Sequence, residues 1–177
     1  DGSRELCDEI ASKNDCVKVI HQENGGVAQA RNTGMKNACG KYLMFMDADD
    51  QFIADEWHTV ISCAEKEIDF AAFSYDSMFM DGKLVEEPFP EEVDGSADDE
   101  RFMNVLLGTP LLHTCWGKLF KSDIVKLHGL SFPSGVAVGE DYIFVMEYCK
   151  YIETQTLKNV PVLKYFQNPS GAMRSFN

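Results

Sequence analysis

The sequence carries its clearest indication of the fold in Tyr42-Leu43-Met44-Phe45-Met46-Asp47-Ala48-Asp49-Asp50. The first five residues are too apolar for a strand with one face in water and too few for a helix. They predict a central strand that is buried on both faces. Three carboxylates follow it directly. Ligands of layered α/β proteins bind outside the carboxyl ends of the strands, so the acidic cluster is expected at a binding edge.

The segments around this strand alternate between helical and extended patterns. Upstream, a helical pattern capped by Ser3 is followed by the β-branched run 17–20, a turn at 24–26 and a helix that ends at Gly40. Downstream, the patterns predict helices near 57–64, 99–107 and 140–150, strands near 68–75 and 160–166, and an unassigned segment at 116–127. Such alternation predicts an α/β fold in which helices flank a mostly parallel central sheet.

Composition limits the classes of protein to consider. The 177 residues are 45% hydrophobic and 25% charged, with a formal net charge of −13, which suits one globular domain and opposes nucleic-acid binding. The longest apolar runs are about five residues, far short of the roughly 20 that span a bilayer. The stretch 81–100 carries nine carboxylates against Lys83. With Pro88, Pro90 and Gly95 in it, the stretch is interpreted as a solvated surface excursion without chemistry.

The six cysteines stand at positions 7, 16, 39, 63, 115 and 149. No C-x-x-C pair occurs, which disfavours zinc. Most of these cysteines lie beside apolar residues, so we expect buried free thiols in a reducing compartment, with the cytoplasm as the default.

The aspartates at 47, 49 and 50 crowd three carboxylates into four positions, which is costly unless a cation or hydrogen-bond donors offset the repulsion. Mg²⁺ or Mn²⁺ would compensate, and substrate phosphates would complete the shell of the ion. The alternative is a solvated turn with an Asp that caps the next helix.

Two further motifs each allow two interpretations when only their spacing is considered. The glycine turn at 24–26 precedes a helix whose N–H groups could bind an anion, and Arg31 either ties that helix to the Asp47 loop or touches substrate. Glu140 and Asp141 begin an apolar helical pattern. They act either as helix caps, which is the favoured role for the motif taken alone, or as a general base, and spacing does not decide between the two.

Taken together, the motifs resemble those of family 2 glycosyltransferases of the GT-A fold. The resemblance rests on Asp1-Gly2-Ser3, Asn24-Gly25-Gly26-Val27-Ala28-Gln29-Ala30-Arg31-Asn32-Thr33-Gly34, Gly40-Lys41-Tyr42 and Met46-Asp47-Ala48-Asp49-Asp50. Further on, Cys115-Trp116-Gly117-Lys118-Leu119-Phe120-Lys121, Phe132, Gly139-Glu140-Asp141-Tyr142-Ile143-Phe144 and Ser170-Gly171-Ala172-Met173-Arg174 are similar to bacterial polysaccharide-assembling members.

This resemblance implies an inverting, Mn²⁺- or Mg²⁺-dependent transfer of a sugar from a nucleotide diphosphate to an acceptor hydroxyl. It implies Asp141 as the catalytic base, Asp49 as the metal ligand, and Asp1 and Asp47 as nucleotide-sugar-binding residues. Trp116, Lys118 and Glu140 would lie on the acceptor side, although core packing is the commoner role of such a tryptophan. Arg174 would screen diphosphate charge.

The resemblance also implies an organisation and partners. The single domain 1–177 would comprise a nucleotide-sugar and metal half at 1–80, the acidic excursion at 81–100 and an acceptor half at 101–177. The family's first strand, helix and second strand are absent from the sequence, so we expect an N-terminally truncated segment. The expected partners are a UDP-sugar or related donor and a saccharide or lipid-linked saccharide acceptor. A cytoplasmic location with peripheral membrane association, and homo-oligomers, are compatible with this interpretation.

Two other interpretations use the same residues. A metal-dependent nucleotidyltransferase or phosphotransferase would transfer the phosphorus-bearing group instead of the sugar. A catalytically silent nucleotide-sugar-binding or interaction module would bind without turnover. The products of the reaction distinguish the three.

Overall fold

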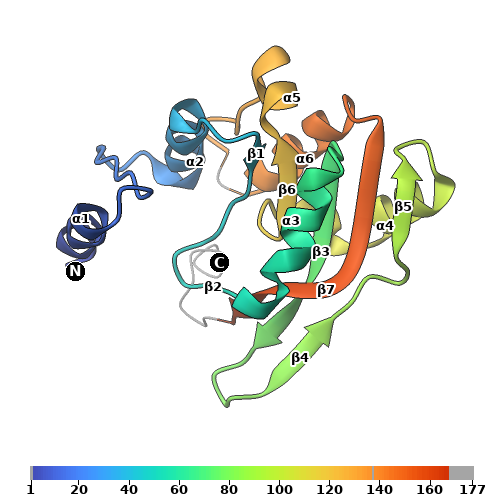
Figure 1. Ribbon diagram of the computed structural model, residues 1–177, viewed down its shortest axis with the longest axis horizontal. Helices are drawn as coiled ribbons and strands as arrows, with labels where there is room; N and C mark the ends of the chain where they lie inside the picture. Colours follow the sequence, from blue (N-terminus) through green and yellow to red (C-terminus); the bar gives the residue numbers. More distant parts are fainter. Residues whose placement is uncertain (1, 137, 168–177) are drawn as a thin grey trace.

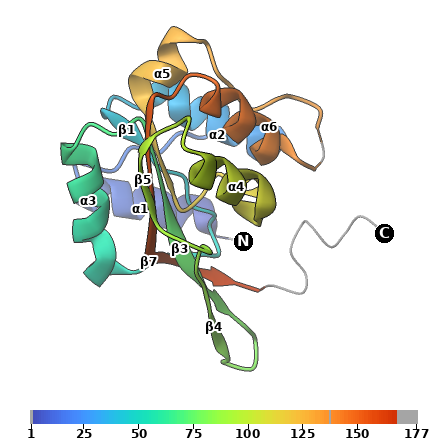
Figure 2. The same ribbon diagram turned by 90° about the vertical axis from the view of Figure 1, so that its right-hand side faces the viewer.

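The computed structural model of the chain describes residues 2–136 and 138–167. In that part, seven strands form one mixed sheet with helices on both faces (Figure 1 and Figure 2). The helices are α1 Ser3–Lys13, α2 Gly26–Asn37, α3 Trp57–Glu65, α4 Glu100–Gly108, α5 Ser122–Leu127 and α6 Glu140–Cys149, with 3₁₀ turns η1 Ala54–Glu56 and η2 Pro110–His113. The strands are β1 Tyr42–Leu43, β2 Gln51–Phe52, β3 Phe70–Met78, β4 Leu84–Glu87, β5 Val93–Ser96, β6 Lys118–Lys121 and β7 Thr154–Phe166.

Strand β3 is the centre of the sheet. It pairs with β6 on one side and β7 on the other, and residues 70–74 are buried. Phe70 and Ala72 belong to the larger apolar cluster, which includes residues of α4 and α6, whereas Ala71 and Phe73 pack with residues of α3. The continuous apolar run of β3 is therefore explained by burial on both faces.

The segment 42–46 does not hold the central place that its composition predicts. Only Tyr42 and Leu43 form a ladder, with β6, and Phe45 adds a single bridge to Trp116. Strand β1 ends the strand order, and residues 42–45 are half-buried. The prediction of a strand buried on both faces is wrong here, because a sheet edge leaves these side chains partly open.

The prediction of a mostly parallel sheet is also wrong for the described strands. Of their ladders, only β3 with β7 is parallel, whereas β1–β6, β3–β6, β3–β4, β2–β7 and β5–β7 are antiparallel. Strands β3 and β4 form a hairpin. Alternation of helices and strands indicates layers, but the direction of each strand depends on where the connection returns to the sheet.

The acidic stretch 81–100 belongs to the sheet. It contributes β4, which pairs with β3, and β5, which pairs with β7. Phe89 and Val93 are buried, and most carboxylates of the stretch are exposed. Its surface position agrees with the sequence interpretation, but the stretch is not an excursion outside the sheet.

Local patterns predicted the helices well. Helices α3, α4 and α6 confirm the predictions near 57–64, 99–107 and 140–150, and Asp99 caps α4 by accepting the Arg101 N–H at 2.9 Å. The run 17–20 forms no strand in the described chain, and α1 buries no side chain.

All six cysteines are free, but Cys7, Cys16 and Cys39 are exposed, contrary to the expectation of buried thiols. Across the described residues, no helix has the length and apolar character needed to cross a membrane.

Candidate active site

The guanidinium of Arg31 joins three carboxylates from separate parts of the chain. Its Nη2 donates to Asp47 Oδ1 at 2.8 Å, and its Nη1 donates to Asp141 Oδ1 at 2.5 Å and Glu140 Oε1 at 3.5 Å. Arg31 lies on α2, Asp47 follows β1, and the two other residues begin α6. The planar guanidinium of arginine can bind several carboxylates at once, which the compact ammonium of a lysine does less well.

Helix α2 is fixed to the segment that holds Phe132. Asn32 Nδ2 donates to the Phe132 carbonyl, and Asn32 Oδ1 accepts the Phe132 N–H, both at 2.8 Å. The Arg31 guanidinium carbon lies 5.4 Å from the centre of the buried Phe132 ring, a cation–π distance. These contacts restrict the position of Arg31 between the two acidic segments.

Asp141 is the most buried carboxylate of the cluster, at 8% exposure. Its Oδ2 accepts the backbone N–H of Cys115 at 2.9 Å, while Oδ1 accepts from Arg31. Burial raises the pKa of Asp141, and the charge of Arg31 opposes that rise. Each carboxylate oxygen has a second lone pair, so Asp141 can still accept a proton from a bound hydroxyl.

The capping interpretation of this motif is not supported. Gly139 occupies the N-cap of α6 with a φ of 94°, and no side chain caps the helix there. Such a φ favours glycine. The carboxylate of Asp141 instead binds Arg31 and Cys115, which lie on other segments.

Arg31 retains its charge in this setting. Burial acts to lower its pKa, but the surrounding acidic groups, including Asp141 and Asp47, outweigh burial and raise the pKa. The cluster therefore combines a permanent cation with three carboxylates, and the repulsion among the carboxylates is offset by arginine.

The acidic loop after β1 presents its three aspartates differently. Asp47 binds Arg31, Asp49 is exposed, and Asp50 accepts the Phe166 N–H at 3.1 Å through Oδ1. Asp50 Oδ2 is buried without a hydrogen-bond partner, and burial raises the pKa of Asp50 to about 6. Hydrogen-bond donors thus offset part of the repulsion predicted for this loop.

A preformed metal cage is absent from the described residues, since no group of three or more His, Cys, Asp or Glu side chains there could hold a metal ion. An exposed Asp49 carboxylate nevertheless suits Mg²⁺ or Mn²⁺, because Mg²⁺ commonly uses one or two carboxylates with phosphates and water. The unpartnered Asp50 oxygen supplies a further hard ligand atom nearby in sequence. The residues present fit an ion whose shell the substrate completes.

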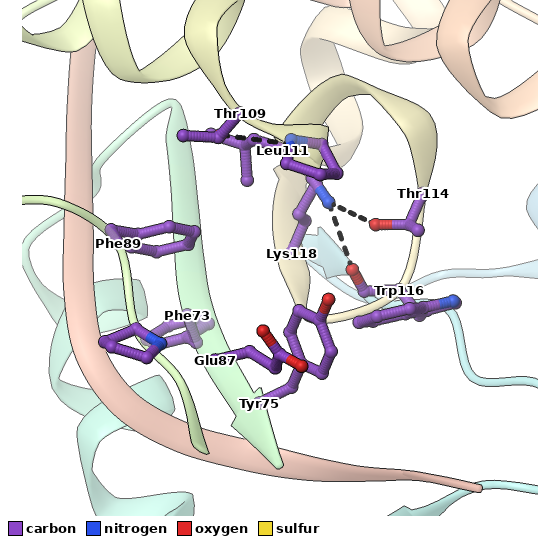
Figure 3. Close-up of a pocket in the computed structure, with 11 residues that line it drawn as sticks. Phe73, Tyr75, Glu87, Phe89, Thr109, Leu111, Thr114, Trp116 and Lys118 are labelled. Carbon is purple, nitrogen blue, oxygen red and sulfur yellow. Dashed lines mark hydrogen bonds between the residues drawn. The ribbon is translucent and has the colours of Figure 1, made fainter. Parts of the chain in front are cut away.

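Trp116 and Lys118 line a cavity of about 110 Å³ (Figure 3). Trp116 is 6% exposed, stacks on Tyr165 at 5.3 Å between ring centres and meets Tyr75 edge-on at 4.7 Å. Trp116 therefore has the packing role that sequence reasoning favoured, and it also lines the cavity. Asp1 and Arg174, the latter in the motif 170–174, lie outside the described residues.

Residues 1–120 match the sequence model of glycosyl transferase family 2. The chain belongs to glycosyltransferase family 2. EpsH of Bacillus subtilis, named as a glycosyltransferase of unproven activity, is 30% identical over 134 residues, which are 75% of this chain and 39% of EpsH. The uncharacterized glycosyltransferase EpsJ of the same organism is 25% identical over 174 residues, which are 97% of this chain and 51% of EpsJ.

A solved structure shares the fold of this family 2 chain. TarS residues 1–349 of S. aureus, crystallised with UDP-GlcNAc, align with a TM-score of 0.79 at 18% identity, over 100% of this chain and 49% of that TarS chain. The GT-A fold predicted from the resemblance is confirmed. This chain spans about half or less of the length of each of these three proteins.

Sequence reasoning missed several members of the candidate site. It left the partner of Arg31 open, and it gave no sign of the Cys115 amide, which is a backbone group. The cavity residues Tyr75, Glu87 and Phe89 come from β3 and the acidic stretch. Arg31 and Cys115 lie inside the motifs 24–34 and 115–121, whereas the three cavity residues lie in no motif.

Proposed function

We propose that the protein containing this chain is an inverting glycosyltransferase that moves a sugar from a nucleotide diphosphate to an acceptor hydroxyl. The observation that carries the proposal is the buried Asp141, held by Arg31 in one cluster with Asp47. A buried carboxylate aimed by fixed donors is the arrangement that a general base requires. Family membership supports the reaction class.

In this proposal, Asp141 performs the proton transfer. It takes the proton of the acceptor hydroxyl while that oxygen attacks the anomeric carbon. The carbon–oxygen bond to the nucleotide diphosphate breaks, and the nucleotide diphosphate leaves with the bonding electron pair. A single displacement of this kind inverts the anomeric configuration.

The remaining predicted residues bind the donor. Asp47 would accept hydrogen bonds from the ribose, and Asp1 would contact the base. Asp49 would hold Mg²⁺ or Mn²⁺ together with the diphosphate, and the ion would act as a Lewis acid for the leaving group. Arg31 positions Asp47 and Asp141 relative to each other through its two bonds of 2.8 and 2.5 Å.

The TarS complexes with UDP-GlcNAc and with UDP favour a UDP-sugar as the donor here. The acceptor would be a saccharide or a lipid-linked saccharide in bacterial surface polysaccharide synthesis. A reaction at the inner face of the plasma membrane, by a peripherally associated protein, fits such an acceptor.

The proposal is tested by calorimetric titration of the whole protein with UDP-, GDP-, dTDP- and CDP-sugars, with and without Mn²⁺. Metal-dependent binding of one donor, followed by release of its nucleoside diphosphate when sugar is transferred, is the expected result. Release of a nucleoside monophosphate would indicate nucleotidyl or phosphoryl chemistry. Absence of donor binding at millimolar concentration would favour an interaction module.

Replacing Asp49 with alanine is expected to remove the Mn²⁺ dependence of donor affinity. The exposed carboxylate supplies the negative charge that holds the ion beside the diphosphate. We expect the dissociation constant in Mn²⁺ to rise by about tenfold or more, equivalent to about 1.4 kcal/mol. Calorimetry measures it, and Asp55→Ala, at an exposed position on η1, is the matched control. Full Mn²⁺-dependent binding by Asp49→Ala would move the metal site elsewhere.

A further inference from the structure

The cavity beside Trp116 is built from segments far apart in sequence. Phe73 and Tyr75 come from β3, Glu87 to Phe89 from the end of β4 onward, and Thr114 to Lys118 from the segment that enters β6. A cavity of about 110 Å³ holds several waters, since one water needs about 10–15 Å³ of such space. It therefore admits a small polar group and a few adjoining ring atoms, but not a whole oligosaccharide.

Lys118 places a cation in the wall of this cavity. The side chain lies in the buried part of β6, with 2% of the residue exposed. Its Nζ donates to Thr114 Oγ1 at 2.9 Å and to the Trp116 carbonyl at 3.2 Å (Figure 3). Both acceptors are neutral. Among the described residues, no carboxylate forms an ion pair with Lys118 and no third acceptor binds its remaining N–H, although Glu87 also lines the cavity.

An ammonium ion in such a position calls for an anion. Burial lowers the pKa of Lys118 to about 8, so most of the side chains remain charged at pH 7. Buried charges are normally paired, because two neutral hydrogen bonds do not replace the lost hydration of an ion. The attraction of Asp141 and the Trp116 ring, whose centre lies 5.9 Å from Nζ, offset only part of this charge, and the spare N–H is present before any ligand binds.

The other walls suit the apolar faces of a sugar ring. The rings of Tyr75 and Trp116 meet edge-on, and Phe73 and Phe89 add buried aromatic surface. Aromatic surface of this kind contributes contact area to a bound ring, while the Lys118 ammonium in the cavity wall fixes the orientation of that ring.

One short segment connects the cavity to Asp141. The Cys115 N–H binds Asp141 Oδ2, and the carbonyl of the next residue, Trp116, binds Lys118. The Asp141 carboxylate and the Lys118 ammonium thus bind backbone groups of two adjacent residues. Asp141 does not itself line the cavity, but its charge acts on Lys118, so the base lies near the wall that holds the ammonium.

We infer that the acceptor is an anionic saccharide, whose carboxylate or phosphate group binds Lys118 in the cavity lined by Tyr75 and Trp116. This inference rests on the proposed function, because the position of Asp141 assigns the cavity to the acceptor. Carboxylate and phosphate share the oxygen chemistry that pairs with an ammonium. They differ in their source, which is an acidic sugar in one case and a phosphorylated one in the other.

The test measures binding of glucose, glucuronic acid and glucose 6-phosphate to the whole protein by NMR titration. We expect the affinity for at least one anionic sugar to exceed that for glucose by about tenfold, as expected for a charge-assisted contact. The anionic sugar that binds more tightly identifies the source. The preference should disappear in Lys118→Met, which keeps an apolar stem of similar length. Lys83→Met, at an exposed position between β3 and β4, is the control.

Separate measurements keep this inference distinct from the proposed function. Donor titration in Mn²⁺ is repeated with Lys118→Met, and unchanged donor affinity is expected. A fall in donor affinity would assign the cation to the donor and overturn the inference. Equal binding of glucose and both anionic sugars by the wild-type protein would overturn it as well, even where donor binding supports the transferase. If the wild-type protein binds no donor, the proposed function is contradicted. The sugar titration then still decides whether Lys118 binds an anionic sugar.

Discussion

Replacing Asp141 with asparagine is expected to slow sugar transfer by about two to four orders of magnitude, the usual contribution of a general base. The amide keeps the shape of the side chain but cannot take the proton of the acceptor hydroxyl. One amide oxygen can still accept from Arg31 or from the Cys115 N–H, although not from both as the carboxylate does. The proposed donor-binding residues are others, so donor affinity should remain close to that of the wild type.

Two measurements check this expectation. Steady-state kinetics with saturating donor gives the change in kcat, and calorimetry gives the donor affinity of the same variant. The control is Glu147→Gln, on the same helix but away from Arg31 and paired with Lys150. A transfer rate within tenfold of the wild type would remove Asp141 as the base.

The pH profile gives an independent check on Asp141. A base must be ionised to act, and burial raises the pKa of this carboxyl above its ordinary value. The rate should therefore fall as the pH decreases through that raised pKa, at a higher pH than for an exposed aspartate. A rate that stays constant down to the ordinary range of aspartate would contradict the assignment.

Sequence patterns predicted the helices because helical periodicity is a local property. The apolar pattern of 57–64 and the Asp99 cap each depend on residues a few positions apart. The structure has the first in α3 and the second at the start of α4. Strand direction and strand order depend on distant partners. The run 42–46 is apolar enough for a central strand, but the pairings of β3 with β6 and β7 occupy the centre and leave β1 at the edge.

The candidate site was predictable to the extent that its residues occur in recognisable motifs. Asp47 and Asp141 were found through the family resemblance, and the structure brings both to Arg31. Spacing could not show that Arg31 reaches across 110 positions to Asp141, because the contact depends on where the fold places α2 relative to the start of α6. The Cys115 N–H is part of every backbone, so no side-chain pattern could reveal its role.

Replacing Arg31 with methionine is expected to have the second large effect, on both stability and activity. The change leaves Asp47, Glu140 and Asp141 near one another without their shared cation. Removing one partner of a buried ion pair costs about 3 kcal/mol at the low end of the measured range, and this end applies because Asp47 is partly exposed. For a chain of this size, that cost corresponds to a fall in Tm of about 6–12 °C.

The activity of Arg31→Met should also depend on pH in a way that simple unfolding does not produce. The charge of Arg31 holds the pKa of Asp141 down against burial. Without that charge the pKa rises further, so more of the base is protonated at neutral pH, and raising the pH should restore part of the lost rate. Arg31→Lys retains the charge but cannot bridge the separate carboxylates, so it should recover the pH profile more fully than the stability.

The matched control for Arg31 is Lys36→Met, an exposed cation on the same helix, whose loss should change Tm by no more than about 2 °C, as for an ordinary surface substitution. Thermal melts and pH–rate profiles of the three variants separate the structural effect from the electrostatic one. If Arg31→Met melted like Lys36→Met and kept the wild-type pH profile, the carboxylates would not depend on Arg31, and the cluster would be a consequence of packing. If the shift in the pH profile appears as expected, Arg31 is a positioning residue that sets the protonation of Asp141 from α2.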